Sequence, residues 1–387
     1  MTTLLISAGD ASGDLHAAEF VRAFRAQHPD ARILGLGGDE MRRAGVELVV
    51  HQRDLAVGGL LELGRSLAKI VSTWRAMVRV LARANPDLVV LVDSGGFNLP
   101  FARRVRRRCG AKILYFVAPQ VWAWRPGRIR KLARRVDRMA VIFPFEPAVY
   151  AETELPVEFV GHPLIDKLAE VAGEIDRETA RTRLGCGATS CIISLFPGSR
   201  SNEVRNQLPL QLAAAALLHT RFSDLRFLLA IAPTVSRAAI DRLITAAGLP
   251  AALNLEVVHG RSREVMLASD VVLAKPGTVT VELALLARPM VVVGRVNPVT
   301  ALVLRRAVRV PFYAMPNLVA GREIVPEFLQ EDARPEAIAQ AVAQLMDGPT
   351  RERQLKDLAE VSELLSSSGA ARRASEIAGE MLEAAAK

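Results

Sequence analysis

Residues 88–98 read Leu-Val-Val-Leu-Val-Asp-Ser-Gly-Gly-Phe-Asn, and this stretch decides the fold class. The continuous apolar run 88–92 predicts a strand of a parallel sheet, because strands covered on both faces are typically apolar at every position. Similar short runs alternate with amphipathic stretches at residues 4–7, 33–36, 113–117 and 139–143. This alternation predicts an α/β fold with a doubly wound parallel sheet.

A second series of apolar runs follows at residues 191–196, 226–231, 255–258, 271–273 and 290–293. The chain has 387 residues, more than the roughly 100–200 of a usual domain. We therefore predict two Rossmann-like domains, 1–161 and 162–364, with the junction at Gly161-His162-Pro163. The Ala-, Glu- and Leu-rich stretch 352–386 should be helical, and residues 365–387 are expected to form a C-terminal helix.

Positive charge is concentrated in one segment of the chain. The formal net charge is +9, yet residues 101–140 alone carry 13 Lys and Arg against the single acid Asp137. Such a segment attracts anions such as nucleic acid, anionic lipid or phosphorylated substrates. The alternative is that the charges only solvate helix faces.

Composition also limits the cellular setting. The three cysteines form no CxxC pattern, which argues against a disulfide framework or a zinc site, and the six histidines form no metal-binding pattern. The first residues lack the charged lead and long apolar stretch of a signal peptide, and no stretch reaches the roughly 18 apolar residues of a membrane span. We expect a cytoplasmic protein, or one that lies on a membrane without crossing it.

Ligands of open α/β sheets bind at the carboxyl ends of the strands, so the residues after each apolar run are the candidate site. The first run is followed by 7–14, Ser-Ala-Gly-Asp-Ala-Ser-Gly-Asp, which is a ligand loop or an ordinary turn capped by Ser12 or Asp14. Asp93 follows 88–92 and is placed as a catalytic base, or alternatively as a helix cap. Residues 118–125 include Trp122 and Trp124, which either line a sugar or acyl pocket or pack in a hydrophobic corner.

Two turns in the second series begin helices. Residues 197–203 contain Gly198, Ser199 and Arg200, where free N–H groups and the arginine charge favour a phosphate over a plain cap. Gly277 and Thr278 open a similar turn, with Glu282 one helical turn later, where it could hold a ribose diol. Two anion-binding helix starts in one domain indicate a nucleotide diphosphate.

The stretch 54–82 is amphipathic and rich in Leu, Val and Ile. It is either a helix packed on the core or an acyl-chain groove or membrane-contact surface.

Taken together, the motifs resemble the lipid-A-disaccharide synthases, a family of GT-B glycosyltransferases. The resemblance spans nearly the whole chain and is carried by residues 7–14, Pro119-Gln120-Val121-Trp122-Ala123-Trp124-Arg125, Phe143-Pro144-Phe145-Glu146, Gly161-His162-Pro163, Pro197-Gly198-Ser199-Arg200 and Pro316-Asn317-Leu318-Val319-Ala320-Gly321-Arg322. It implies two facing Rossmann-like domains, an N-terminal one for the acceptor and a C-terminal one for the UDP-sugar, with the C-terminal helix crossing back onto the first.

The implied reaction transfers 2,3-diacylglucosamine from UDP to 2,3-diacylglucosamine 1-phosphate (lipid X), with inversion and without a metal or cofactor. The products are UDP and a β-1′,6-linked disaccharide 1-phosphate. The family requires the residues matching Asp93, Arg200 and Asn317. Donor contacts are expected from Gly198, Ser199, Arg200, Gly277, Thr278 and Glu282, and contacts to substrate from Ser12, Gly13, Asn98, Gln120, Trp122, Trp124 and Arg125.

The chain departs from the family at two positions. Gly96 stands where the family often has a second acid, which leaves Asp93 as the one candidate base in that motif. Pro276 stands where a serine is usual, so that the hydroxyl contact is missing, while Lys275 adds a charge beside it.

The expected partners are both acylated substrates and an anionic membrane surface, so the protein would be cytoplasmic and peripherally bound to the inner membrane. The sequence gives no oligomeric state. The alternative function is another GT-B enzyme acting on UDP-N-acetylglucosamine, either a 2-epimerase or a transferase with a soluble acceptor. Nucleic acid is not an expected partner, because the chain has no recognisable DNA-reading module.

Overall fold

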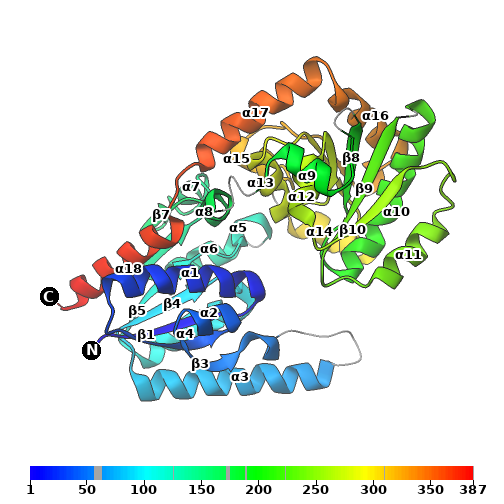
Figure 1. Ribbon diagram of the computed structural model, residues 1–387. Coiled ribbons are helices and arrows are strands. Elements are labelled where there is room, and N and C mark those ends of the chain that lie inside the picture. Colours follow the sequence, from blue (N-terminus) through cyan, green and yellow to red (C-terminus); the bar gives the residue numbers. More distant parts are fainter. Residues whose placement is uncertain are drawn as a thin grey trace. The chain divides into compact units, whose positions relative to one another are not determined.

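The computed structural model describes residues 1–55, 63–124, 126–170, 175–187, 190–222, 224–308 and 310–386. The chain forms two compact units (Figure 1). The first is Met1–Asp166 together with Leu365–Lys387, and the second is Lys167–Leu364. The first boundary therefore follows Asp166, where the sequence suggested residue 161.

A parallel sheet with the strand order β3-β2-β1-β4-β5-β6-β7 forms the centre of the first unit, counting the described residues. Its strands are β1 (Thr3–Ala8), β2 (Arg32–Gly37), β3 (Glu47–His51), β4 (Leu88–Val92), β5 (Lys112–Phe116), β6 (Arg138–Val141) and β7 (Val157–Phe159). The helices between them are α1 (Ala11–Gln27), α2 (Asp39–Arg43), α3 (Leu63–Ala84), α4 (Gly95–Arg108), α5 (Val121–Trp124), α6 (Ile129–Ala133), α7 (Glu146–Val149) and α8 (Pro163–Glu170), which runs into the second unit, with 3₁₀ turns at Gln52–Asp54 and Pro126–Arg128.

The second unit repeats this plan with the strand order β10-β9-β8-β11-β12-β13 over its described part, again all parallel. The strands are β8 (Cys191–Phe196), β9 (Leu225–Ile231), β10 (Leu255–His259), β11 (Val271–Ala274), β12 (Met290–Gly294) and β13 (Glu327–Leu329). The helices are α9 (Arg177–Arg183), α10 (Ser201–Arg221), α11 (Arg237–Ala246), α12 (Ser262–Ala268), α13 (Thr278–Leu285), α14 (Pro298–Ala307), α15 (Met315–Ala320), α16 (Pro335–Met346) and α17 (Pro349–Leu365), with a 3₁₀ turn at Gln330–Asp332.

Burial explains why the apolar runs become central strands. Every residue of β4, β11 and β12 is buried, as expected for strands covered by helices on both faces. Separate hydrophobic cores form in the two units, one around Leu91, Phe101 and Tyr115 and the other around Leu195, Phe227 and Val291. Each unit therefore has the core of an independent domain.

The C-terminal helix α18 (Ala370–Ala386) returns to the first unit and packs on α1, as Figure 1 shows. Asp166 accepts hydrogen bonds from the N–H groups of Gly369 and Ala370, which caps this helix. Gly161 has a φ of +93°, and a Cβ there would lie 2.0 Å from the carbonyl oxygen of Ser367. A residue with a side chain at position 161 would therefore push the returning segment away.

The expected helix over 352–386 is interrupted between α17 and α18 at residues 366–369. The amphipathic stretch 54–82 corresponds to α3, while its residues 56–62 lie outside the described residues. No helix in the described ranges is long and apolar enough to span a membrane.

Candidate functional site

Three adjacent strands of the first unit place the N-terminal candidate residues together. β4 pairs with β1 and β5, so the residues after Ala8, Val92 and Phe116 lie at one edge of the sheet. The backbone N–H of Gly9 donates to the Ser94 hydroxyl at 3.0 Å. The loop after β1 is therefore fastened to the loop after β4.

Asp93 has an unusual backbone conformation. Its φ is +47°, and the φ of Ser94 is +45°, a left-handed region that non-glycine residues rarely occupy. The Asp93 carbonyl accepts hydrogen bonds from the buried Tyr115 hydroxyl at 2.5 Å and from the Asn98 side chain at 3.0 Å. Surrounding groups thus hold a strained backbone in place, an arrangement that recurs at functional sites.

The Asp93 carboxyl is only partly buried and accepts a hydrogen bond from the Ser94 N–H at 2.7 Å. The Ser94 hydroxyl donates to Asp10 at 2.9 Å, which brings a second acid to the same edge. Burial, followed by the nearby Asp10 carboxylate, raises the pKa of Asp93. Such a carboxylate is a stronger base than an exposed aspartate, as a general base requires.

Two residues predicted to contact substrate are part of the scaffold in this structure. The Asn98 side chain is fully buried; it accepts from the Ser7 hydroxyl and donates to the carbonyls of Ser7, Val92 and Asp93. Gly13 is also buried, and its N–H donates a hydrogen bond to the Asp10 carboxylate. Asp10 therefore caps α1, where the sequence suggested Ser12 or Asp14. Asn98 therefore positions Asp93, because its polar atoms are already engaged within the protein. Asp14 instead holds the start of α2, since it accepts hydrogen bonds from the N–H groups of Gly38, Glu40 and Met41.

The aromatic motif after β5 divides between exposed and buried residues. Ser12 in the first loop and Gln120 in this one are exposed, whereas Trp122 is buried against Phe145 and donates its indole N–H to Glu146 at 3.1 Å. Trp122 thus forms the hydrophobic corner that was the alternative to a sugar-stacking wall. The side chain of Trp124 and all of Arg125 lie outside the described residues.

Glu146 is a buried acid in the Phe143-Pro144-Phe145-Glu146 motif, and the sequence analysis assigned it no role. It accepts hydrogen bonds from Trp122 and from the backbone N–H groups of Ile142 and Phe143. Burial raises its pKa to about 7. Glu146 therefore joins the aromatic motif to the loop after β6.

An apolar pocket of about 220 Å³ lies next to the Asp93 loop in the first unit. Helix α3 contributes Ile70, Val71 and Trp74, and the start of α4 contributes Gly96, Phe97 and Pro100. A Cβ at Gly96 would meet no atom within 4 Å, so the residue that replaces the usual acid leaves open space. The pocket is where the sequence suggested an acyl-chain groove.

In the second unit, the Gly-Ser-Arg loop between β8 and α10 carries an internal carboxylate. Glu203 accepts hydrogen bonds from the N–H groups of Ser199 and Arg200 at 3.1 and 3.3 Å. The expectation that these N–H groups are free is therefore wrong for this structure. The Arg200 side chain is 79% exposed and available to a ligand, although it contacts Glu203 at 3.4 Å.

The second turn lies beside the first. β11 pairs with β8, and Lys275 after β11 lies 3.2 Å from Glu203. Partial burial raises the pKa of Glu203, but the Lys275 ammonium and the loop N–H groups outweigh it and hold the pKa below its usual range. Gly277 has a φ of +146° and precedes Thr278, which is exposed at the start of α13. The positive charges of Arg200 and Lys275 therefore lie near two helix starts.

Glu282 is half-buried on α13, and burial raises its pKa. Asn317 on α15 is fully buried: it donates to Val325 and Glu327 and accepts from the N–H groups of Ile324 and Val325. In this structure its side chain holds the segment before β13. The catalytic role of Asn317 stays a prediction.

Comparison with known proteins gives the family. The family model for lipid-A-disaccharide synthetase matches residues 4–381 of the chain.

The chain belongs to the lipid-A-disaccharide synthase family.

Lipid-A-disaccharide synthases from several bacteria are similar to it over nearly their full length. The protein of Geobacter metallireducens is 40% identical over 382 residues, covering 98% of this chain and 97% of its own. The protein of Myxococcus xanthus is 38% identical over 381 residues, with the same coverage. This chain is accordingly a glycosyltransferase of the lipid-A-disaccharide synthase family, and the alternative of a 2-epimerase or another GT-B enzyme is not favoured.

Solved structures agree on the fold. A putative UDP-N-acetylglucosamine 2-epimerase from Listeria monocytogenes has a TM-score of 0.67 at 13% identity, covering 99% of this chain and 97% of its own. Sucrose-phosphate synthase from Thermosynechococcus elongatus has a TM-score of 0.63 at 16% identity, covering 99% and 100%. At such identities the likeness shows only the architecture, and it confirms the predicted GT-B class with two parallel sheets for this lipid-A-disaccharide synthase family member.

Proposed function

We propose that this glycosyltransferase transfers 2,3-diacylglucosamine from UDP to the 6-hydroxyl of 2,3-diacylglucosamine 1-phosphate. The acceptor oxygen attacks the anomeric carbon from the face opposite UDP, the bond to the diphosphate breaks, and the configuration inverts. The observation that carries the proposal is the family match over residues 4–381, which includes Asp93 and Arg200.

Asp93 accepts the proton of the attacking hydroxyl. Its partly buried carboxylate and raised pKa suit this task, and a positioned base typically contributes about 10²–10⁴-fold to the rate. Asn98 and Tyr115 hold the Asp93 backbone, and Ser94 links it to Asp10. These neighbours fix the direction in which the carboxylate points.

The departing UDP carries the developing negative charge. The exposed Arg200, the Lys275 ammonium and the N-terminus of α13 at Thr278 stabilise the diphosphate. Gly277 allows the backbone to approach the phosphates closely. Glu282, one turn along α13, binds the ribose hydroxyls.

The first unit binds the acceptor. The apolar pocket beside Gly96 and Phe97 takes part of an acceptor acyl chain, since it lies next to the loop that carries Asp93. Ser12 and Gln120 are exposed at the same edge and contact the sugar.

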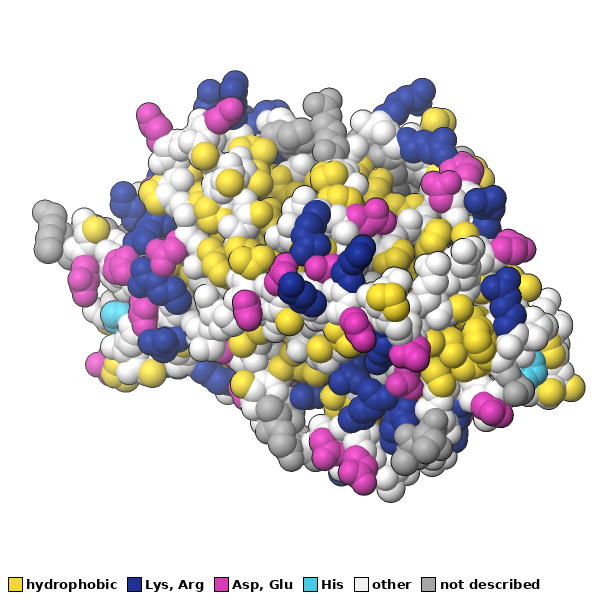
Figure 2. All heavy atoms as spheres, turned by 90° about the horizontal axis from the view of Figure 1, so that it is seen from above, with side chains coloured by type: hydrophobic (Ala, Val, Ile, Leu, Met, Phe, Trp, Pro, Cys, Tyr) yellow, Lys and Arg dark blue, Asp and Glu magenta, His cyan; other side chains and the backbone are white. Residues whose placement is uncertain are grey.

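The basic segment binds an anionic lipid surface or guides the acceptor phosphate. Burial lowers the pKa of Arg135, and nearby Arg103, Arg107 and Arg128 lower it further, which indicates a cluster of like charges. Figure 2 shows lysine and arginine side chains among both hydrophobic and acidic ones on the face that it presents. Each basic residue near an anionic surface contributes about 1 kcal/mol, weakened by salt. Liposome sedimentation that does not change with salt would refute this role.

A product assay tests the proposal. Purified protein is mixed with both acylated substrates in the presence of a chelator, and mass spectrometry should find the disaccharide 1-phosphate and UDP in equal amounts. UDP release without disaccharide, or product only from deacylated substrates, would refute it.

A further inference from the structure

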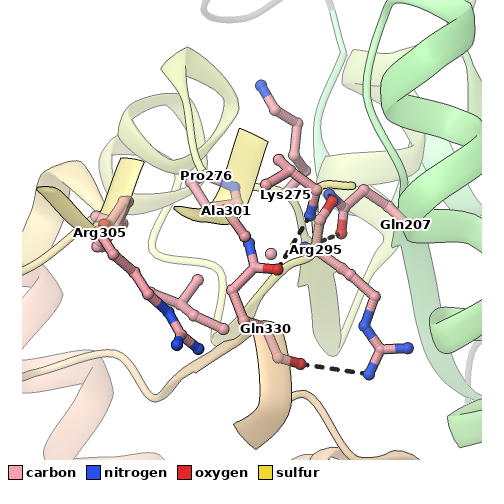
Figure 3. A pocket seen from close by; sticks show the side chains of 11 residues that line it. Gln207, Lys275, Pro276, Arg295, Ala301, Arg305 and Gln330 are labelled. Atoms are coloured by element: carbon pink, nitrogen blue, oxygen red, sulfur yellow. Dashed lines mark hydrogen bonds between the residues drawn. The ribbon is translucent and has the colours of Figure 1, made fainter. Parts of the chain in front are cut away.

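The second unit contains an apolar pocket of about 200 Å³ that none of the expected contacts explains. Its wall is mostly apolar and includes Pro276, Gly294, Val296, Ala301 and Leu329. Figure 3 shows the pocket with the side chains that line it. They come from α10, the loop after β11, the end of β12 and the loop after it, α14, the segment before α15, and the end of β13 with the turn after it.

Strand pairing places this pocket beside the proposed diphosphate site. β12 lies between β11 and β13, with Ala274 opposite Val292 and Gly294 opposite Leu329. The residues after β11 and β12 therefore lie side by side. Pro276 lines the pocket and directly precedes the Gly277-Thr278 turn.

Several polar groups around the pocket are already engaged within the protein. Gln207 donates to the Arg295 carbonyl at 2.6 Å and accepts from its N–H at 3.0 Å. The Arg295 guanidinium donates to the carbonyl of Gln330, whose own side chain accepts from the Val296 N–H, and dashed lines in Figure 3 mark such bonds. Arg305 pairs with Glu331.

This arrangement favours an apolar ligand. A uracil ring or a sugar hydroxyl placed in the pocket would lose its hydrogen bonds to water, and the lining groups above, being engaged, would not replace them. An apolar cavity of about 150 Å³ is large enough to bind benzene. The pocket here is slightly larger and accommodates several carbons of a hydrocarbon chain.

We propose that this pocket binds the proximal part of one acyl chain of the donor sugar. The inference rests on the proposed function, because it takes the donor to be an acylated glucosamine joined to a diphosphate at the neighbouring turn. The chain enters beside Pro276 and lies against Ala301 and Leu329. Each methylene group that is buried there strengthens donor binding about fourfold.

Calorimetry on the full-length protein tests this inference with three ligands. They are UDP, UDP-N-acetylglucosamine and a UDP-2,3-diacylglucosamine whose chains are short enough to remain monomeric. Ala301→Phe fills the pocket, and Leu329→Ala enlarges it. Thr300→Phe is the matched control, because Thr300 is exposed on the same helix and does not line the pocket.

The expected result is that the wild type and Thr300→Phe bind the diacylated ligand at least tenfold more tightly than UDP-N-acetylglucosamine. Ala301→Phe should lose at least tenfold of this preference while its affinity for UDP changes less than twofold. If Ala301→Phe also loses UDP binding, Leu329→Ala decides the matter: a weakened preference for the short chains supports the inference, and an unchanged preference overturns it.

Retention of the full preference in Ala301→Phe, or its absence in the wild type, would overturn the acyl site. Failure of the proposed function is a separate result, since the wild type would then form no disaccharide from the two acylated substrates. A protein that makes the disaccharide and keeps its chain preference in both variants would retain the function without this pocket.

Discussion

The Lys275 ammonium lies 3.2 Å from the Glu203 carboxylate, which thus bridges the two turns of the proposed diphosphate site. The same carboxylate accepts hydrogen bonds from the N–H groups of Ser199 and Arg200. An internal acid therefore occupies donors that an incoming phosphate would also seek. Glu203 orders the loop and at the same time lowers the positive charge available to the ligand.

Glu203→Gln should strengthen UDP binding. Glutamine retains an oxygen for the loop N–H groups but removes a negative charge, so that Lys275 and Arg200 both act on the diphosphate. We expect about a tenfold gain in UDP affinity at low salt, which decreases as salt screens the charges. Titration calorimetry over a salt series measures this, with Glu178→Gln, at an exposed residue of α9, as the matched charge-change control. Unchanged or weaker binding would show that the carboxylate is needed to shape the site.

Asp93→Asn should make the protein more stable at neutral pH. A raised folded-state pKa means that the folded protein holds this proton more tightly than the unfolded chain does, so ionisation of Asp93 disfavours folding. The wild type therefore loses stability as pH rises from the usual aspartate range through the raised pKa, and the asparagine variant does not. Asparagine also tolerates the left-handed backbone.

Thermal unfolding of both proteins across pH checks this prediction. The difference in melting temperature should be smallest in acid, grow as pH rises through the raised pKa and then level off. A variant that is less stable than the wild type at neutral pH would contradict the assigned cost of the buried charge.

Trp122→Phe should lower stability mainly above pH 7. The substitution removes the indole N–H that supports Glu146, whose pKa is raised to about 7 by burial. A hydrogen bond to a charged group contributes about 1.5–3 kcal/mol, and the loss should be smaller where Glu146 is protonated. Denaturant unfolding at about pH 5.5 and about pH 8 measures the difference, because these values lie on either side of the Glu146 pKa of about 7. An equal loss at the two pH values would assign Trp122 a packing role alone.

Asn317→Ala should destabilise the second unit by about 2–6 kcal/mol. It leaves the buried N–H groups of Ile324 and Val325 without their acceptor, and unsatisfied buried groups cost about 1–3 kcal/mol each. Activity should fall together with stability, measured by unfolding and by product formation at low temperature. Full stability combined with lost turnover would support Asn317 as a catalytic residue.

Sequence reasoning found the strands because their apolar runs are local signals. Leu88–Val92 and Cys191–Phe196 became β4 and β8 as expected, and the residues after them carry Asp93 and Arg200. The short strands β7 and β13 have only three half-buried residues each, too few to produce a pattern in the sequence. Their positions depend on pairing with neighbouring strands.

The supporting acids were missed for a related reason. Asp10 and Glu146 act on residues that are distant along the chain, so their roles arise only when the fold brings those residues together. Glu203 was the exception, since a glutamate at the third position of a helix matches the acidic half of the capping box, although Arg200 stands where that pattern has Ser or Thr. That pattern could have indicated that the loop N–H groups were already engaged.

The most direct test of the central claim is the pH dependence of disaccharide formation by the wild type and Asp93→Asn, with UDP affinity measured in parallel. We predict that kcat/KM of the wild type falls in acid with an apparent pKa above that of an ordinary aspartate. The variant should lose about 10²–10⁴-fold with UDP affinity unchanged. Turnover by Asp93→Asn near the wild-type level, with the same acid limb, would contradict the role of Asp93 as the base.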